Sequence, residues 1–245
     1  MERNENRLRL HDAGDNGQDG AGREDPGAIM QNRQNPLCRF YEGLRDRLIV
    51  YFETRDITHK PKLVTVTSCS KGAGVSSIAA GLAASLSETG DGNVLLVNIS
   101  GERGAAHQFY RGKLGCSLDE ALASDKGQST LVKANLYTDL EQTNGDMLPA
   151  NLPKKISALM PKLKASEYDY IIFDMPPVSQ TSVTARLSGL MDMVLLVIES
   201  EKTNQDAVKQ ANQLLAESKA KVSTVLNKTR NYVPRRLHQE FLDNA

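Results

Sequence analysis

The sequence is short of cysteine, histidine and net charge, and each shortage removes a class of function. Its three cysteines are odd in number and lack metal-binding or redox spacing. The four histidines are scattered, so the sequence predicts no Ser-His-Asp arrangement. Thirty basic residues balance thirty acidic ones, so no long-range field favours nucleic acid, and we expect no nucleic-acid partner.

Long apolar runs are also missing. The longest, such as Met193–Ile198, are far shorter than the ~20 residues that span a bilayer. The N-terminus is polar and has no apolar stretch of the kind found in signal peptides. About 40% hydrophobic residues is enough for a sizeable core. We therefore expect a reduced, cytoplasmic protein.

The chain divides into a domain and two tails. Residues 1–35 are rich in Asn, Asp, Gly, Gln, Glu and Arg, which predicts a disordered N-terminal tail. We expect the domain over residues 36–235 and a short C-terminal tail over 236–245. Apolar residues at helical spacing predict a helix after Pro36 that is closed before Pro61: Phe40, Tyr41, Leu44, Leu48 and Tyr51.

Beyond Pro61, apolar runs alternate with helix-length segments. The runs predict five buried parallel strands, over residues 63–67, 94–97, 170–173, 194–198 and 222–226. The segments between them predict helices over residues 76–89, 154–165 and 202–218. This alternation predicts an α/β fold with a doubly wound, mostly parallel sheet flanked by helices.

A glycine-rich loop leaves the first predicted strand and opens the first predicted helix. On the phosphate-binding pattern G-x-x-x-x-G-K-[ST], Gly74 and Ser76 match, whereas Cys69 and Val75 replace the first glycine and the lysine. We predict that backbone N–H groups here bind nucleotide phosphates. The predicted binding residues are Ser70, Lys71, Gly72, Ala73, Gly74, Val75, Ser76 and Ser77. The alternative is a glycine-rich turn that merely enters a helix.

Val75 removes the lysine that would face the β- and γ-phosphates, where charge builds during phosphoryl transfer. Lys71 could reach the same phosphates, although it lies one position past the extra lysine of the ParA/MinD-type loop. The loop alone therefore predicts binding better than it predicts catalysis.

Two other strand ends carry candidate site residues. Asp174 ends an apolar strand, as a Walker B carboxylate does, and with Ser76 it is the predicted Mg²⁺ ligand and the one catalytic candidate. Its alternative role is to cap the following turn. Asn227 ends the last strand, where its amide could contact a nucleotide base or stabilise a turn.

These motifs together resemble the bacterial tyrosine autokinases of capsule and exopolysaccharide synthesis, within the ParA/MinD-like P-loop superfamily. Asp174-Met-Pro-Pro177 is similar to the D-x-P-P segment of that family, which is fairly specific. The resemblance covers about residues 36–235, through the segments 67–83, 94–100, 168–178, 191–200 and 222–228. The other segments are shared with ParA/MinD relatives.

The resemblance implies a domain that binds ATP or ADP with Mg²⁺ at the inner face of the plasma membrane. It implies a membrane polysaccharide co-polymerase as partner, a ring of subunits and autophosphorylation of a C-terminal tyrosine cluster. In the family's oligomerisation motif E-x-x-R-x-x-R, Glu42 and Arg45 match the first two charges, while Leu48 takes the third position. We therefore expect Glu42 and Arg45 to contribute to a homo-oligomer.

The sequence departs from the family where its chemistry lies. Val75 replaces the loop lysine, and Asn98 and Ser100 replace the two aspartates of the second-strand motif. Tyr232 is alone where the family has a tyrosine cluster. We therefore expect a kinase-like protein with impaired phosphotransfer. The alternatives are an active autokinase with a site rebuilt around Lys71, and a ParA/MinD-type ATPase.

Overall fold

The computed structural model describes residues 36–88, 92–99, 116–123, 131–135 and 152–229. Its centre is a sheet of six strands in the order β3-β2-β4-β1-β5-β6, and every neighbouring pair is parallel. The strands are β1 Lys62–Ser68, β2 Val94–Asn98, β3 Leu131–Asn135, β4 Tyr170–Asp174, β5 Met193–Glu199 and β6 Val222–Asn227. The predicted doubly wound α/β fold is confirmed.

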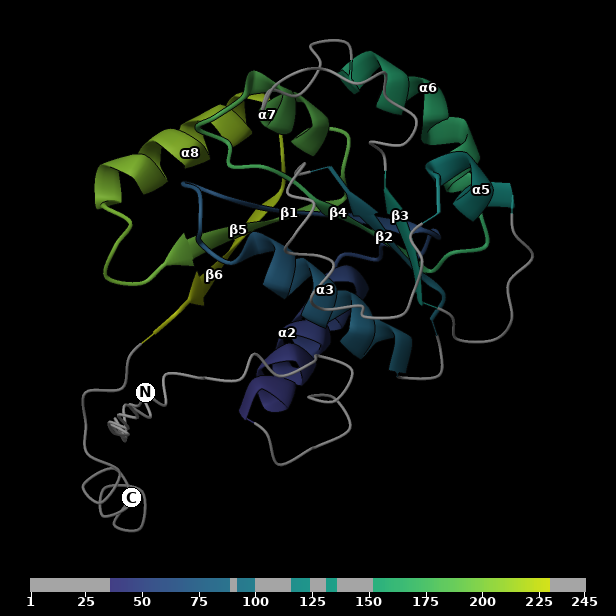
Figure 1. Cartoon of the computed structure of the whole chain (residues 1–245), viewed down its shortest axis with the longest axis horizontal. Helices are drawn as coiled ribbons and strands as arrows, with labels where there is room; N and C mark the ends of the chain where they lie inside the picture. Colours follow the sequence, from purple (N-terminus) through teal and green to yellow (C-terminus); the bar gives the residue numbers. More distant parts are fainter. Residues whose placement is uncertain (1–35, 89–91, 100–115, 124–130, 136–151, 230–245) are drawn as a thin grey trace, which may run out of the picture.

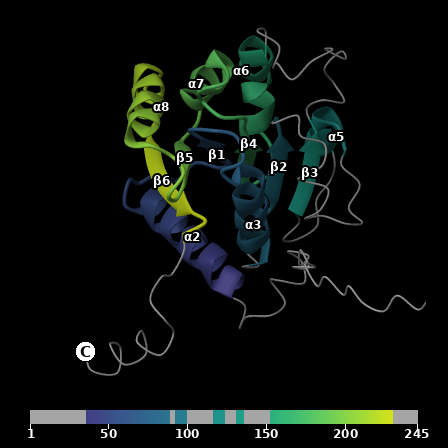
Figure 2. The same ribbon diagram turned by 60° about the vertical axis from the view of Figure 1, so that its left-hand side comes forward.

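Helices cover both faces of the sheet. Those of the described residues are α2 Pro36–Glu53, α3 Val75–Glu88, α5 Leu118–Ala123, α6 Leu152–Lys164, α7 Ser182–Ser188 and α8 Gln205–Glu217. Helices α2 and α3 lie on one face, and α6, α7 and α8 lie on the other (Figure 1). Figure 2 shows the same layers from the side, with α3 packed directly on the sheet and α2 outside it.

Alternating side chains explain why each strand needs cover on both faces. Leu63 packs in the cluster under α5, α6 and α7, whereas Val64 packs in the cluster under α2 and α3. Leu95 and Leu96 of β2 divide in the same way. Successive side chains of a strand point to opposite faces, so an apolar run is buried on both sides only when helices cover both.

Helix α2 packs closely on α3 because α3 offers small residues. The side chains of Tyr41 and Leu48 on α2 are buried. A Cβ added to Gly81 of α3 would come within 2.2 Å of the Tyr41 ring, so only glycine fits beneath that ring. The Tyr41 hydroxyl donates a hydrogen bond to the carbonyl of Ser77 at 3.1 Å. Helix α2 is thereby tied to the first turn of α3.

The prediction of five strands was one short, and two short helices were not predicted. Strand β3 has only two adjacent apolar residues followed by Lys133, so no apolar run marks it. Helix α5 spans six residues and α7 seven, too few to repeat a helical pattern clearly. The predicted tails, over 1–35 and 236–245, lie outside the described residues.

Candidate nucleotide site

All six strands end in polar residues at one edge of the sheet. In chain order from β1 to β6, these residues are Ser68, Asn98, Asn135, Asp174, Glu199 and Asn227. Register pairs Asn98 with Asp174 and Glu199 with Asn227. In parallel α/β sheets the carboxyl ends of the strands form the edge where ligands bind. The candidate site therefore lies at this edge.

The loop between β1 and α3 crosses this edge. Two of its residues, Gly72 and Gly74, have positive φ angles of 84° and 93°, which side chains other than glycine rarely adopt. The N–H of Ile78 donates to the carbonyl of Gly74 at 3.0 Å, which starts the α3 hydrogen-bond ladder. Because the first N–H groups of a helix have no partner within it, they are available to an anion at the loop.

Side chains from β1 and from the segment after β4 hold the beginning of the loop. The Ser68 hydroxyl donates to the carbonyl of Ser70 at 2.7 Å, and the Ser179 hydroxyl donates to the carbonyl of Cys69 at 2.7 Å. The N–H of Val178 donates to the carbonyl of Ser68 at 3.0 Å. The carbonyls of residues 68–70 therefore all have donors.

The end of β6 holds the middle of the loop. The Asn227 side-chain amide donates to the carbonyl of Ala73 at 2.8 Å, and the Lys228 ammonium donates to the carbonyl of Gly72 at 2.6 Å. A Cβ added to Gly74 would lie 2.4 Å from Asn227 Nδ2. The Asn227 amide thus contacts the loop backbone, and its predicted contact with a nucleotide base stays a prediction.

Glu199, Lys202 and Lys228 form a small charge cluster beside this contact, which the sequence analysis did not predict. The Glu199 side chain is buried at the end of β5, 3.0 Å from the ammonium of Lys228 and 3.3 Å from that of Lys202. The hydrogen bond from Lys228, assisted by Lys202, lowers the pKa of the Glu199 carboxyl despite its burial. Glutamate at the end of an apolar strand was the available signal, by the same rule that singled out Asp174.

The predicted metal ligands lie at the same edge. Asp174 is buried between β1 and β2, opposite Val66 and Asn98. Ser76 lies in the first turn of α3. A carboxylate and a hydroxyl suit the oxygen preference of Mg²⁺, so the residues fit this ion. Among the described residues, however, no three His, Cys, Asp or Glu side chains gather into a metal site.

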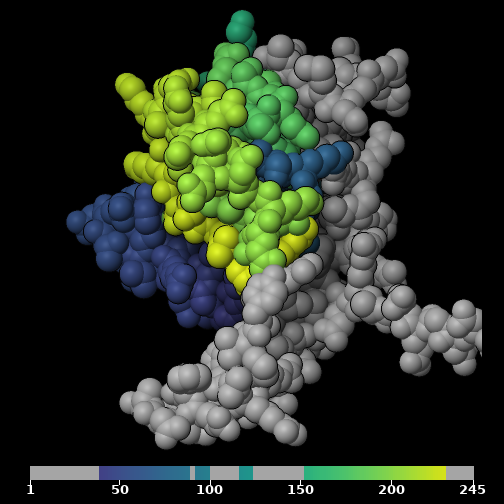
Figure 3. All heavy atoms as spheres, turned by 90° about the vertical axis from the view of Figure 1, so that its left-hand side faces the viewer, coloured from purple at the N-terminus to yellow at the C-terminus, as the bar shows by residue number. Residues whose placement is uncertain are grey.

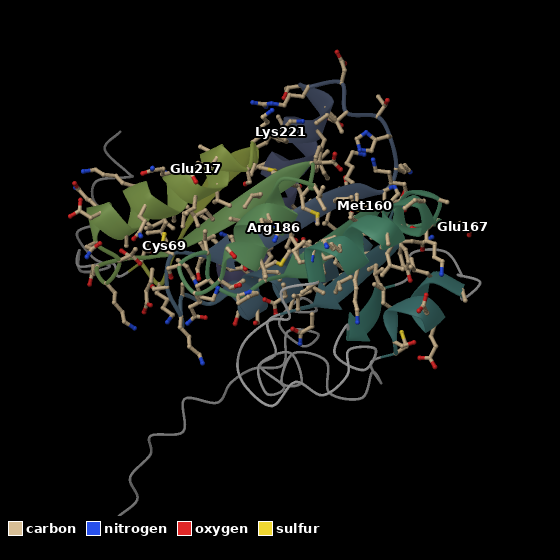
Figure 4. All side chains as sticks on the ribbon, turned by 90° about the horizontal axis from the view of Figure 1, so that it is seen from above. Cys69, Met160, Glu167, Arg186, Glu217 and Lys221 are labelled. Carbon is tan, nitrogen blue, oxygen red and sulfur yellow. The ribbon has the colours of Figure 1, made fainter. Side chains whose placement is uncertain are left out.

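The side chains of the other predicted loop residues differ in their surroundings. Val75 packs against the cluster beneath α2 and α3, and Lys71 is exposed. Cys69 packs with residues of α7 and α8 on the opposite face of the sheet, where burial raises the pKa of its thiol (Figure 4). Ser100 and Tyr232 lie outside the described residues.

Glu42 and Arg45, the predicted oligomerisation residues, lie on α2, which is at the surface below α8 and β6 (Figure 3). The Arg45 guanidinium forms an ion pair with Asp46 at 2.8 Å and donates to the Ser85 hydroxyl at 3.4 Å. Its side chain is only 18% exposed. Arg45 is therefore engaged within its own chain, to α3.

Within the part of the chain that the structure describes, no helix is both long enough and apolar enough to cross a membrane. No protein-family profile matches the chain. Proteins similar to this chain are found both among curated sequences and among solved structures.

The sequence relatives are tyrosine kinases. Tyrosine-protein kinase YwqD of Bacillus subtilis is 28% identical over 174 residues, which cover 69% of this chain and 73% of YwqD. The putative tyrosine-protein kinase EpsB of Ralstonia nicotianae is 28% identical over 206 residues, which cover 82% of this chain. The chain spans 27% of the length of EpsB.

Solved structures share the fold. The chimerical protein CapA2B2 aligns with a TM-score of 0.60 at 23% identity, covering 83% of this chain and 90% of that one. A putative plasmid partition protein from Borrelia burgdorferi, bound to AMPPNP, aligns with a TM-score of 0.52 at 20% identity, covering 76% and 84%. The chain therefore shares its parallel α/β fold with CapA2B2 and the plasmid partition protein, and its sequence is similar to those of bacterial tyrosine kinases.

Proposed function

We propose that this protein is a kinase-like, nucleotide-binding component of exopolysaccharide or capsule synthesis, with impaired or absent phosphotransfer. It acts through nucleotide-dependent assembly with a membrane polysaccharide co-polymerase, at the inner face of the plasma membrane. YwqD and EpsB are both named as tyrosine kinases. This chain corresponds to 27% of the length of EpsB, so the rest of that protein has no counterpart in the match. The partner and the location are therefore inferred by likeness.

One observation carries the proposal: the loop backbone is built for an anion, while the charged side chains beside it are replaced. Gly72 and Gly74 have the positive φ angles of a tight loop, and Lys228 and Asn227 donate hydrogen bonds to the carbonyls of Gly72 and Ala73. Backbone N–H groups and the helix dipole bind phosphate without any lysine side chain. This supports binding of ATP or ADP over residues 70–77.

Catalysis of phosphotransfer requires charged groups that nucleotide binding alone does not. Transfer of the γ-phosphoryl group depends on cations placed where negative charge develops, and removing one such group commonly costs about 10²–10³-fold in rate. Val75 is apolar and packs toward the core. Asn98, an amide, stands opposite Asp174 where the family pattern has a carboxylate. Both changes lower the expected rate of phosphotransfer.

The metal would be held mainly by the nucleotide. Asp174 and Ser76 would supply the protein ligands of Mg²⁺, and the metal would neutralise phosphate charge. With Asp174 as the one carboxylate among the predicted ligands, we expect the protein alone to bind Mg²⁺ weakly. Nucleotide binding should therefore depend less on Mg²⁺ than it does in a P-loop that keeps its lysine and carboxylates.

Calorimetry with ATP and ADP, each with and without Mg²⁺, tests binding. We expect ADP to bind in both conditions, with a modest loss of affinity when EDTA removes the metal. A wild-type protein that binds neither nucleotide at millimolar concentration would contradict the proposed binding function.

Incubation with labelled ATP and Mg²⁺ tests the catalytic part. We expect negligible labelling of tyrosine. Val75→Lys alone should not restore it, because the second-strand carboxylates are still absent. Robust tyrosine label on the wild-type protein would instead favour an active autokinase with a rebuilt site, and Lys71→Ala would then show whether Lys71 replaces the missing cation.

A further inference from the structure

We propose that Lys228 is a positioning residue for the nucleotide site, and that it passes part of its positive charge to bound phosphate through the peptide group between Gly72 and Ala73. This inference rests on the proposed nucleotide binding. It assigns a role to a lysine that lies outside the phosphate-binding loop by sequence, more than 150 residues further along the chain.

The geometry begins with two successive carbonyls held from the same side. Lys228 donates to the carbonyl of Gly72, and Asn227 donates to the carbonyl of Ala73. In the described residues the one cis peptide bond is Lys60–Pro61, so the loop peptides are trans. In a trans peptide the C=O and the following N–H point in opposite directions. The N–H groups of Ala73 and Gly74 are therefore directed away from the end of β6.

These two N–H groups are the ones that a phosphate on the open side of the loop would meet. Positive φ at Gly72 and Gly74 lets the chain present successive N–H groups to one concave side, as in other anion-binding nests. Fixing the two carbonyls from behind holds that concave arrangement before any ligand arrives. The clamp formed by Asn227 and Lys228 thus reduces the ordering that binding requires.

Lys228 differs from Asn227 in its charge. A cationic donor on a carbonyl polarises the peptide group, and hydrogen bonds joined in a chain strengthen one another. The N–H of Ala73, in the peptide group whose carbonyl Lys228 contacts, becomes a better donor to an anion. Lys228 therefore supplies indirectly part of the positive character that Val75 does not supply.

Glu199 keeps the ammonium in place without cancelling the charge of the cluster. Its buried carboxylate contacts both Lys228 and Lys202, so one negative charge faces two positive ones. These three side chains together carry a net positive charge. The Lys228 side chain is 48% exposed, so its contribution is screened by salt and by water, and we expect a moderate effect.

The test is ADP affinity, measured by calorimetry at low salt, for four variants. Lys228→Arg keeps donor and charge, Lys228→Gln keeps a donor without charge, and Lys228→Met keeps neither. Lys202→Met is the matched control, because the ion pair and the hydrogen bond of Lys202 among the described residues are both with Glu199 and not with the loop. We expect about tenfold weaker binding for Lys228→Met, an intermediate loss for Lys228→Gln, and little change for the other two.

The salt dependence of ADP affinity distinguishes the effect of the Lys228 charge from the effect of its hydrogen bond to the loop. The difference between wild type and Lys228→Gln should shrink in 1 M NaCl, whereas a purely structural role would be insensitive to salt. In the ligand-free protein, the amides of Ala73 and Gly74 should exchange hydrogen faster in Lys228→Met than in Lys202→Met. This exchange rate measures how firmly Asn227 and Lys228 hold the loop, and the measurement needs no nucleotide.

The outcomes are distinct. If wild type binds ADP and all three Lys228 variants bind equally well, the inference is overturned while the proposed function stands. If Lys202→Met weakens binding as much as Lys228→Met, the effect belongs to the general charge of the edge, and the specific role of Lys228 is wrong. Wild-type protein that binds no ADP removes the proposed function and this inference together.

Discussion

The backbone of the loop at residues 69–74 and the side chains around it differ in how well they fit a phosphate-binding site. The backbone keeps two glycines with positive φ, and side chains from three segments satisfy its carbonyls. The charged side chains fit less well, since Val75 and Asn98 stand where the motifs that the sequence resembles have lysine and aspartate. The proposed function therefore requires that binding geometry and catalytic charge be separable in this fold.

The physical reason lies in what each part supports. The loop backbone is tied to β1, to β6 and to the segment after β4, so changing its shape disturbs the fold. The loop lysine and second-strand carboxylate of the family motifs contribute to chemistry and little to packing, so we expect them to be replaceable without unfolding, unlike Lys228 and Glu199, which fix the loop. The first of four predictions tests this contrast directly, and the other three test the packing and assembly of α2, from the largest expected effect to the smallest.

Gly74→Val should produce the largest effect on the site. The new side chain would meet Asn227 Nδ2, at 2.4 Å for Cβ alone, and would have to adopt a φ of 93°. We expect nucleotide binding to be lost and the free energy of unfolding to fall by about 3 kcal/mol. Calorimetry with ADP and denaturant unfolding measure the two.

Gly72→Val is the matched control for that prediction, because Gly72 has a φ of 84° but a Cβ there meets nothing within 4 Å. The control carries the backbone strain alone, so the difference between the two variants isolates the contact with Asn227. In an Asn227→Ala background the extra loss from Gly74→Val should shrink. Equal losses for both glycine variants would contradict the close approach of β6 to the loop.

Gly81→Val tests the packing of α2 on α3, away from the site. A Cβ at Gly81 would overlap the Tyr41 ring, so α2 must shift, and we expect a loss of about 2–3 kcal/mol in the free energy of unfolding. Gly43→Ala on α2 is the control: its Cβ meets nothing within 4 Å, and we expect a gain of about 0.5–1 kcal/mol. Thermal and denaturant unfolding of both variants decide it, and a harmless Gly81→Val would be inconsistent with this packing.

Tyr41→Phe should have a smaller effect that depends on pH. Losing the hydrogen bond to Ser77 should cost about 1 kcal/mol at pH 8. Burial raises the pKa of Tyr41 to about 12. Below pH 10 the tyrosine is protonated in both folded and unfolded chains, so its contribution is fully present. Between pH 10 and about 12 the unfolded chain ionises first, and the contribution is lost.

The advantage of wild type over Tyr41→Phe should therefore fall as the pH rises from 10 to 12. Burial also raises the pKa of Tyr168 and Tyr170, but both tyrosines are present in both proteins and cancel in the difference. Denaturant unfolding at pH 8, 10 and 11 measures it. A constant difference at all three values would mean that Tyr41 is not buried as described.

Glu42→Arg should have the smallest effect on the monomer. Exposed charge pairs on a helix contribute at most about 0.5 kcal/mol, so thermal stability should hardly change. If α2 meets a neighbouring subunit or the membrane partner, close pairs across that boundary contribute more, and the variant should weaken assembly in a salt-dependent way. Sedimentation of wild type and variant at low and high salt tests this. Identical profiles in every condition would reduce α2 to intramolecular packing.

Arg45 sets a limit on that assembly prediction. Its guanidinium is engaged with Asp46 and Ser85 of the same chain, so the assembly effect should be carried mainly by Glu42. Arg45→Ala would then lower stability, through its contact with α3, more than it lowers self-association. This difference between two residues three positions apart gives the experiment an internal control.

The amino-acid sequence by itself determined the alternation of strands and helices, because continuous apolar runs are stable only when buried on both faces of a parallel sheet. It also located the loop at Gly72–Ser76 and the carboxylate of Asp174, since these occur where a strand ends. Strand β3 was not predictable in this way, because Leu131–Asn135 has too few apolar residues to stand out.

Only the tertiary structure decided which distant side chains meet the loop. Asn227 and Lys228 are more than 150 residues from the carbonyls they hold, and Glu199 reaches Lys228 because β5 and β6 are paired in register. Likewise, Tyr41 meets Gly81 through the packing of two helices. Such contacts depend on strand order and helix placement, and local sequence pattern carries no information on either.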